Sequence, residues 1–341
     1  MKTEELQSHL AKFSRLSLGS YPTLLEPMPR LSAQLGHPLF IKRDDLVGPG
    51  LGGNKTRKLE FLLADAQNRK AKKVVTFGGL QSNHARLTAA AANRLGMQTH
   101  LFYFEHKPAV FRGNLLINQI LQAKMHFLPF GSGSNQISIE TTIGLVRLIA
   151  FLTVGSHYFI PVGGHSFLGC LGYVQAAIEI EHQAQLSGIP NAWLVVAAGT
   201  GGTLAGLLAG LSMIGSNIRP LGIDVGKLWK GFPVSTAHLA RKICSLLGES
   251  MDFPVEDLPL IEGKYVGPGY GQASQECLSA LQILAQKEGI LLDPIYTGKA
   301  FAGLFDLVKK GYFSPGDPII FLHTGGLPTL FTIGNLQSLD G

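Results

Sequence analysis

A lysine at the junction of a glycine-rich loop and a helix is the residue best placed to do chemistry. Lys55 follows Gly52-Gly53-Asn54, and the apolar residues after it recur at helical spacing, at Leu59, Leu62, Leu63 and Ala66. The helix dipole and the charges of Arg57 and Lys58 disfavour a further ammonium, so we expect a lowered pKa for Lys55. A neutral lysine amine is a nucleophile that forms a Schiff base with an aldehyde. Taken alone, the alternative is a solvated lysine at a helix start.

A second loop has the composition of a phosphate-binding loop. Its sequence is Ala198-Gly199-Thr200-Gly201-Gly202-Thr203, and it stands between a strand-like and a helix-like segment. Glycines let backbone amides converge on an anion, and two threonine hydroxyls and a helix N-terminus add donors. No Gly-Lys-Ser/Thr follows, and Leu204 occupies the third glycine position of a dinucleotide fingerprint. A tight turn without a ligand is the alternative.

Three further loops carry polar side chains that could contact a ligand. Ser82, Asn83 and His84 follow Gly78-Gly79, where helix capping and binding of a carboxylate are equally good explanations. His84 has no partner at i+4, which argues against a metal site. Thr324 precedes two glycines, and its hydroxyl could bond a heteroaromatic nitrogen. Tyr270 and Tyr296 place phenols in flexible loops, where tyrosines are more often structural when taken singly.

These groups together fit one cofactor, pyridoxal 5'-phosphate (PLP). PLP has an aldehyde for the lysine, a phosphate for the 199–203 loop, and a ring hydroxyl and ring nitrogen for the polar loops. The alternative is a protein that binds a nucleotide or sugar phosphate without covalent chemistry. That alternative leaves the lysine segment unexplained, and a non-enzymatic scaffold leaves even more unexplained.

The elements that must position these loops alternate between strand and helix, which predicts an α/β fold with parallel sheets covered on both faces. In such folds ligands bind in loops at the carboxyl ends of strands, where the loops above lie. We expect the chain to cross between two lobes near Gly163-Gly164. The expected strands are 74–77, 98–104, 125–128, 158–162, 193–198, 219–225 and 318–322, and the expected helices are 84–95, 114–122, 171–186, 204–214, 272–287 and 300–310.

Composition limits the remaining classes. The 341 residues are 45% hydrophobic and 15% charged, which is typical of a soluble globular protein of about two domains. The net charge is +6, but the basic residues are scattered, so we expect no nucleic-acid partner. Three distant cysteines favour reduced thiols and a cytoplasmic location, with no metal. The apolar stretch 145–162 is short for a membrane span and predicts a buried helix followed by a strand.

The chain resembles the fold-type II PLP enzymes, and within them the family that holds 1-aminocyclopropane-1-carboxylate deaminase and D-cysteine desulfhydrase. The similar stretches occur in family order over nearly the whole chain. They are IKRDDLVGPGLGGNKTRKLEFLLADA (41–66), GGLQSNHARLTAAAANRLGM (78–97), GNLL (113–116), PVGG (161–164), AAGTGGTLAGLLAG (197–210), EGILLDPIYTGKAFAGL (288–304) and HTGG (323–326).

The resemblance implies two three-layer αβα lobes with mainly parallel sheets, similar to tryptophan synthase β. Residues 1–54 and 163–341 would form the large cofactor-binding domain and 55–162 the small domain, usually in a homodimer. By matching position, the catalytic residues would be Lys55, which forms the Schiff base, with Ser82, Tyr270 and Tyr296. Asn83 would bond the ring hydroxyl and Thr324 would adjoin the ring nitrogen. Thr200, Gly201, Gly202 and Thr203 would hold the phosphate, and Ser82, Asn83, His84 and Thr297 would contact the substrate.

Position 297 separates the two subfamilies. The ring-opening deaminases carry a glutamate there, whereas this chain has Tyr296-Thr297-Gly298-Lys299, similar to the desulfhydrases. A carboxylate near the ring nitrogen makes the cofactor a stronger electron sink, which opening a cyclopropane needs and loss of sulfide does not. The resemblance therefore implies conversion of D-cysteine and water to pyruvate, hydrogen sulfide and ammonia. Aminocyclopropane deamination and elimination from L-cysteate are the alternatives, because His165-Ser166 and residues 271–274 depart from the family pattern.

Overall fold

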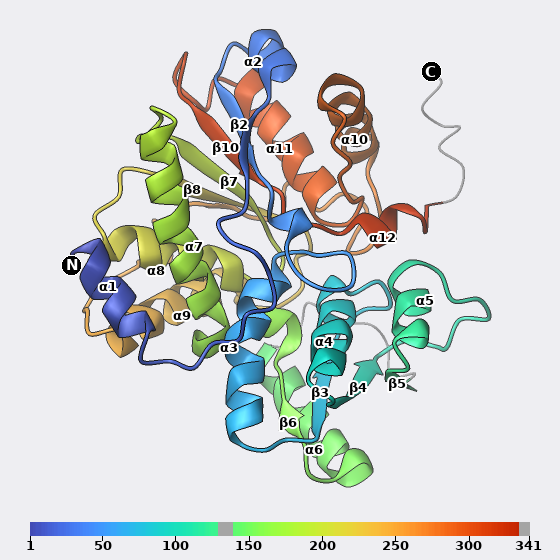
Figure 1. Cartoon of the computed structure of the whole chain (residues 1–341). Coiled ribbons are helices and arrows are strands. Elements are labelled where there is room, and N and C mark those ends of the chain that lie inside the picture. Colours follow the sequence, from blue (N-terminus) through green and yellow to red (C-terminus); the bar gives the residue numbers. More distant parts are fainter. Residues whose placement is uncertain (129–138, 334–341) are drawn as a thin grey trace.

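Two separate sheets form the framework of the chain, which we describe from a computed structural model for residues 1–128 and 139–333 (Figure 1). The large sheet has the strand order β1-β2-β10-β7-β8-β9 and the small sheet β5-β4-β3-β6. Every neighbouring pair is parallel except β1 with β2. The strands are β1 (Leu25–Pro27), β2 (Leu39–Lys42), β3 (Lys73–Phe77), β4 (Gln98–Tyr103), β5 (Lys124–Phe127), β6 (Tyr158–Phe159), β7 (Trp193–Ala198), β8 (Arg219–Asp224), β9 (Leu260–Ile261) and β10 (Ile319–Leu322).

Helices cover both faces of the large sheet, because its central strands carry apolar side chains on both faces and each face must be buried. In β7, Leu194 and Val196 face one core, whereas Val195 and Ala197 face the other. The first face is covered by α1 (Thr3–Leu10), α7 (Phe167–Leu186), α8 (Gly202–Met213) and α9 (Phe232–Leu246), and the second by α2 (Pro29–Leu35), α10 (Gln275–Glu288) and α11 (Thr297–Lys309). The expected three-layer α/β arrangement is confirmed.

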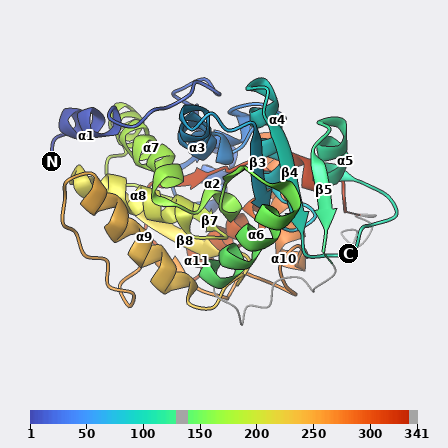
Figure 2. The same cartoon turned by 90° about the horizontal axis from the view of Figure 1, so that it is seen from below.

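The small sheet is also a three-layer unit. One face packs on α3 (Lys55–Asn68), α4 (Asn83–Arg94) and α5 (Gly113–Ile120), and the other on α6 (Ile139–Val154) (Figure 2). The expectation of a buried helix in 145–162 is only half right, since α6 buries Val146, Ala150 and Val154 but exposes Leu148, Phe151 and Leu152 on its outer side. The strand expected after it is confirmed as β6.

Helix α3 joins the two units. Its Leu59, Leu62 and Leu63 pack into the core of the small sheet, whereas Phe61 packs on α7. A buried ion network holds the first turn of the helix to the large sheet. The Arg57 guanidinium donates two hydrogen bonds of 2.8 and 2.7 Å to Asp44 and two of 2.9 Å to Glu179. Tyr173 donates to Asp44 at 2.7 Å, and Lys42 pairs with Glu179.

Three short helical segments complete the ordered elements. They are the 3-10 turns at Asp44–Leu46 and Val162–Gly164 and the helix α12 (Leu327–Leu330). The Val162–Gly164 turn is where the chain passes from β6 to α7, as expected for the crossing point. In the described ranges, no helix is long and apolar enough to cross a membrane, and no group of acidic, histidine or cysteine side chains is arranged to hold a metal ion.

Candidate active site

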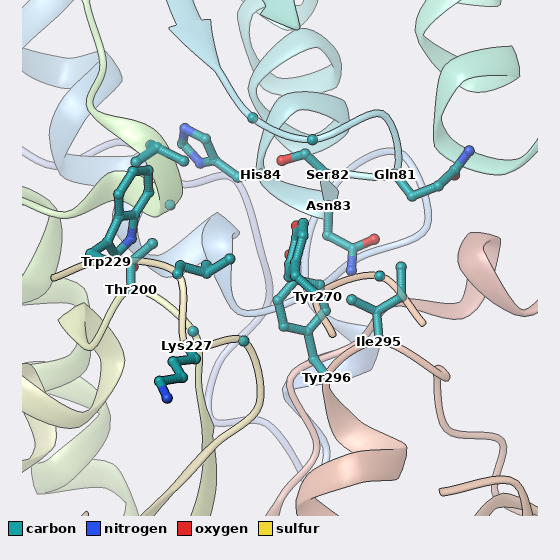
Figure 3. Close-up of a pocket in the computed structure, with 18 of the residues that line it drawn as sticks. Gln81, Ser82, Asn83, His84, Thr200, Lys227, Trp229, Tyr270, Ile295 and Tyr296 are labelled. Carbon is teal, nitrogen blue, oxygen red and sulfur yellow. The ribbon is translucent and has the colours of Figure 1, made fainter. Parts of the chain in front are cut away.

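A cavity of about 950 Å³ opens between the two sheets, at the carboxyl ends of their strands. Its size is within the range of small-molecule sites. In Figure 3 the run from Gln81 to His84 lies on one side, and Tyr270, Tyr296 and Thr200 face it from the other. Ten of the predicted site residues line this cavity: Lys55, Ser82, Asn83, His84, Thr200, Gly201, Thr203, Tyr270, Tyr296 and Thr324.

Lys55 is the first residue of α3, as the sequence indicates, and its side chain is half-buried in the cavity. Burial lowers the pKa of Lys55 well below its usual range, and the Lys58 ammonium lowers it further. The effect expected from Arg57 is absent, because Asp44 and Glu179 neutralise the Arg57 charge. The Lys55 amine is therefore available as a neutral nucleophile.

The glycine-rich loop begins α8 and turns its backbone toward the cavity. Gly201 has φ +79°, a conformation that favours glycine, and Gly202 is buried behind the loop. A Cβ placed on Gly202 would lie 2.8 Å from the Lys58 ammonium nitrogen. Lys58 is completely buried and donates to the carbonyl of Gly163 at 3.2 Å. Backbone amides, a helix N-terminus and this ammonium are donors of the kind that suit a dianionic phosphate.

A hydrogen-bond network fixes how Asn83 faces the cavity. The Asn114 amide donates to Asn83 Oδ1 at 2.8 Å and to the carbonyl of Gln81 at 2.8 Å. Arg86 donates to Asn114 Oδ1 at 2.7 Å, which orients the Asn114 amide in turn. Because Asn83 Oδ1 is already bonded, the Asn83 NH₂ group is left as a donor, and its side chain points toward Tyr270 (Figure 3).

Ser82 and His84 flank Asn83 at the start of α4. Ser82 caps the helix, since its Oγ accepts from the amide of Ala85 at 3.2 Å, and its own hydroxyl proton remains to be donated. His84 Nε2 lies 2.9 Å from Thr76 Oγ1, whereas its buried Nδ1 has no partner among the described residues. Burial lowers the pKa of His84 well below its usual range, and Lys55 and Lys58 lower it further, so the ring is neutral.

The two tyrosines form a pair. Their hydroxyl oxygens lie 2.5 Å apart, and their rings meet edge to face at 6.0 Å. Burial raises the pKa of both phenols, but the hydrogen bond from Tyr296 opposes this effect at Tyr270. Both phenols are therefore protonated, and one donates its proton to the other.

Thr297 differs from the sequence-based expectation, because it does not line the cavity. Its side chain is fully buried, and its hydroxyl donates to Asp293 Oδ1 at 2.6 Å. Asp293 also accepts from the backbone amides of Ile295, Tyr296 and Thr297, so it organises the start of α11. Gly202 likewise lies behind the lining residues, next to Lys58 and Cys170.

The donor set fits PLP. Lys55 offers an amine of lowered pKa, the 199–203 loop with Lys58 offers cationic and amide donors, and Asn83 offers an oriented NH₂ group. Thr324 offers a hydroxyl on the cavity wall, and its carbonyl accepts from the Asn54 amide at 3.0 Å, one residue before Lys55.

Comparison with known proteins decides the family. The family model for pyridoxal-phosphate dependent enzymes matches residues 16–325. The chain is a member of this PLP-dependent enzyme family. Two curated relatives of the family are a D-cysteine desulfhydrase of Serratia proteamaculans (strain 568), 39% identical over 96% of this chain and 98% of that protein, and a putative 1-aminocyclopropane-1-carboxylate deaminase of Pyrococcus furiosus, 36% identical over 97% of both.

Solved structures of PLP enzymes have the same fold. A structure described as a homologue of 1-aminocyclopropane-1-carboxylate deaminase superposes with a TM-score of 0.86, at 37% identity over 97% of both chains. A PLP-dependent aspartate racemase shares the fold alone, with a TM-score of 0.64 at 14% identity over 100% of this chain and 98% of that one. The fold-type II assignment and the cofactor are thus confirmed, whereas the boundaries of the domains and the roles of single residues stay predictions.

Several residues of this PLP site are not found by the sequence reasoning. The charge of Lys58 near Lys55 is foreseen from the sequence, but its burial against Gly202 of the glycine-rich loop depends on the tertiary fold. Asn114 lies within the GNLL motif, but its contact with Asn83 depends on the tertiary fold. Lys227 and Trp229 line the wall opposite α4 without any local signal.

Proposed function

We propose that this chain is a β-elimination lyase that converts D-cysteine and water to pyruvate, hydrogen sulfide and ammonia. The observation that carries the proposal is that position 297 holds a threonine bonded to Asp293; among the described residues that line the cavity, Glu105 is the one acidic side chain. The 39% identical relative named D-cysteine desulfhydrase supports the same activity.

When bound, PLP supplies an electron sink for the electron pair left by removal of the α-proton. The neutral Lys55 amine is the base that takes this proton, because its lowered pKa suits a base near neutral pH. At the start of α4, the Ser82 hydroxyl donates to the substrate carboxylate, which the positive end of the helix also attracts. These two contacts orient the α-carbon toward Lys55.

The tyrosine pair holds a proton for the leaving group. Tyr270 can pass its phenolic proton to the departing sulfur and regain one from Tyr296 through their 2.5 Å hydrogen bond. Burial keeps both phenols protonated before the reaction, since it raises the pKa of each.

Aminocyclopropane deamination is the second candidate, because one relative and one similar structure carry that name. The environment of Thr297 disfavours it. Thr297 lies behind the cavity wall and donates its hydroxyl to Asp293, so position 297 supplies no carboxylate that could keep a ring nitrogen in the cavity protonated. The electron sink is then too weak for ring opening, but it suffices for loss of sulfide. L-Cysteate is a further candidate substrate with a β-leaving group.

The test is to purify the protein, record its visible absorbance, add D-cysteine and follow sulfide and pyruvate. We expect a cofactor absorbance band and equimolar release of sulfide and pyruvate. Lys55→Ala should abolish the band and the release of the two products. Lys72→Ala, at an exposed lysine far from the cavity, is the matched control. A cofactor band with no products from D-cysteine, but ammonia and 2-oxobutanoate from aminocyclopropane carboxylate, would refute the proposed activity in favour of the second candidate.

We also propose that the chain forms a homodimer in the cytoplasm. The family resemblance supports the dimer, and the apolar outer side of α6, with Leu148, Phe151 and Leu152 more than half exposed, offers a surface to cover. Light scattering coupled to size-exclusion chromatography tests the dimer. A monomer at all concentrations would contradict it.

A further inference from the structure

Lys299 is a buried ammonium surrounded by backbone carbonyls. It lies on α11 with 1% of its surface exposed. Its Nζ donates to the carbonyls of Val266 at 2.7 Å and Gly269 at 2.8 Å, with a longer contact of 3.5 Å to that of Val225. Carbonyl oxygens that converge on one point replace the hydration shell of a monovalent cation in other proteins.

The three carbonyls come from two different loops, and both loops line the cavity. Val225 follows strand β8 and leads into the segment of Lys227 and Trp229, whereas Val266 and Gly269 belong to the loop that ends in Tyr270. Gly269 directly precedes Tyr270, so the contact at Gly269 fixes the backbone that carries this phenol. The Lys299 ammonium therefore ties the tyrosine loop to the end of the large sheet.

Asp224 ties the same two loops through their amides. Its carboxylate accepts from the amides of Gly226 at 3.0 Å and Lys227 at 2.9 Å, and from that of Gly263 at 3.0 Å. Asp224 is 1% exposed. The Asp224 carboxylate thus binds amides of the two loops, and the Lys299 ammonium binds their carbonyls.

Plain packing does not account for a charge at position 299. Burial lowers the pKa of Lys299, and the charges of Cys277, Asp293 and Asp224 partly offset this effect. A methionine would fill the same space without the desolvation cost. The charge is retained where it contacts the carbonyls of the tyrosine loop.

We propose that Lys299 is a positioning residue that serves as a built-in monovalent cation, holding the 263–271 loop so that Tyr270 meets Tyr296. It acts through Tyr270 and does not touch the substrate. The Lys299 ammonium takes the place that K⁺ or Na⁺ would occupy in such a cage, so the loop needs no added cation. The part concerning catalysis rests on the proposed function, whereas the part concerning the loop does not.

The decisive variant is Lys299→Ala, which deletes four side-chain atoms that n-propylammonium can replace. Hydrogen–deuterium exchange of the 263–271 segment in the PLP-bound protein reports the loop without any substrate. We expect faster exchange in Lys299→Ala, slowed again by n-propylammonium but not by n-propanol, which is uncharged, or by tetramethylammonium, which has no N–H. Lys309→Ala, at an exposed position of α11, is the matched control and should exchange like the wild type.

A double-mutant cycle, measured as kcat, tests whether Lys299 acts through Tyr270. Lys299→Met should lower kcat by about 10- to 100-fold, as expected for a misplaced catalytic group. In a Tyr270→Phe background the same change should cost less than about threefold, because the two residues act together. Equal costs in both backgrounds would overturn the link to Tyr270.

The outcomes separate this inference from the proposed function. Exchange in 263–271 that is unchanged in Lys299→Ala, or slowed equally by n-propanol, would overturn the role of Lys299. A second outcome is that the wild-type protein releases no sulfide from D-cysteine while Lys299→Ala still shows faster exchange and its rescue by n-propylammonium. That result would refute the proposed substrate and leave the role of Lys299 in the loop standing. If Lys299→Ala does not fold, Lys299→Met serves for the exchange measurement, and unchanged exchange there would also overturn the inference.

Discussion

Substitution of Lys58 by methionine should weaken PLP binding without weakening the protein. Lys58 is completely buried beside the glycine-rich loop, and methionine has nearly the same shape without the charge. The contact with the carbonyl of Gly163 is the one hydrogen bond of this ammonium within the described part of the chain. Because an ammonium has three donors, two N–H groups are left to meet a phosphate.

The substitution is expected to weaken PLP binding but not to lower the stability of the PLP-free protein. A hydrogen bond between charged groups contributes about 1.5–3 kcal/mol, so losing one raises the Kd for PLP about 10- to 150-fold. In the protein without PLP, the same ammonium is a buried charge, and burial lowers its pKa. Removing it should leave the free energy of unfolding unchanged or higher.

The assay is a titration of the PLP-free protein with PLP in a phosphate-free buffer, with urea unfolding of the same sample in parallel. Lys72→Met, the same change at an exposed lysine, is the control and should alter neither quantity. An unchanged Kd in Lys58→Met would show that the phosphate does not contact Lys58. A loss of several kcal/mol of stability without PLP would show a structural role instead.

Three further outcomes follow from buried polar groups. Arg57→Met should cost about 3–5 kcal/mol in urea unfolding, because the buried Asp44 loses its ion-pair partner and Glu179 keeps only Lys42. Arg69→Met, in an exposed pair, should cost less than about 1 kcal/mol. Thr297→Glu should lower both stability and sulfide release relative to Thr297→Gln, since it sets a second carboxylate against Asp293; kinetics equal to those of the wild type would contradict this reasoning. Burial and the Lys58 charge lower the pKa of His165 to about 3. The unfolded chain therefore binds more protons between about pH 3 and 6.5, so stability rises with pH there, by up to about 1.4 kcal/mol per unit for one histidine. His165→Gln should flatten this slope in unfolding measured at several pH values, and an unchanged slope would contradict the lowered pKa.

Much of the fold is predictable because apolar runs in a doubly covered sheet leave a strong pattern. The strand 193–198 is predicted with its observed bounds, and most helices are predicted to within three or four residues. The sequence patterns do not predict α1, β1, α2, β2, α9, β9 and α12. Among these, β2 contains the charged Lys42, and α9 begins with Phe232-Pro233 after a loop. Lys42 fits a buried strand only because Glu179, far along the chain, pairs with it.

The candidate site is predictable where chemistry is local. Lys55 and the 199–203 loop follow from glycines and a helix start in a continuous stretch. The side of α11 that Thr297 faces does not follow, because it depends on the Asp293 carboxylate four residues earlier turning inward. The carbonyls around Lys299 come from two loops 30 to 74 residues earlier in the chain, and no spacing rule brings these together.

The order of strands in the large sheet has a consequence for synthesis on the ribosome. β10, at residues 319–322, inserts between β2 and β7 and pairs with both. Strands of the small sheet, in contrast, all come from residues 73–159. The small sheet can thus form while the chain is still being synthesised. The edge of β2 that pairs with β10 stays without its partner until some 280 further residues have been added. Thr324 stands two residues after β10, so the cavity wall that it forms is completed only after this strand has been synthesised.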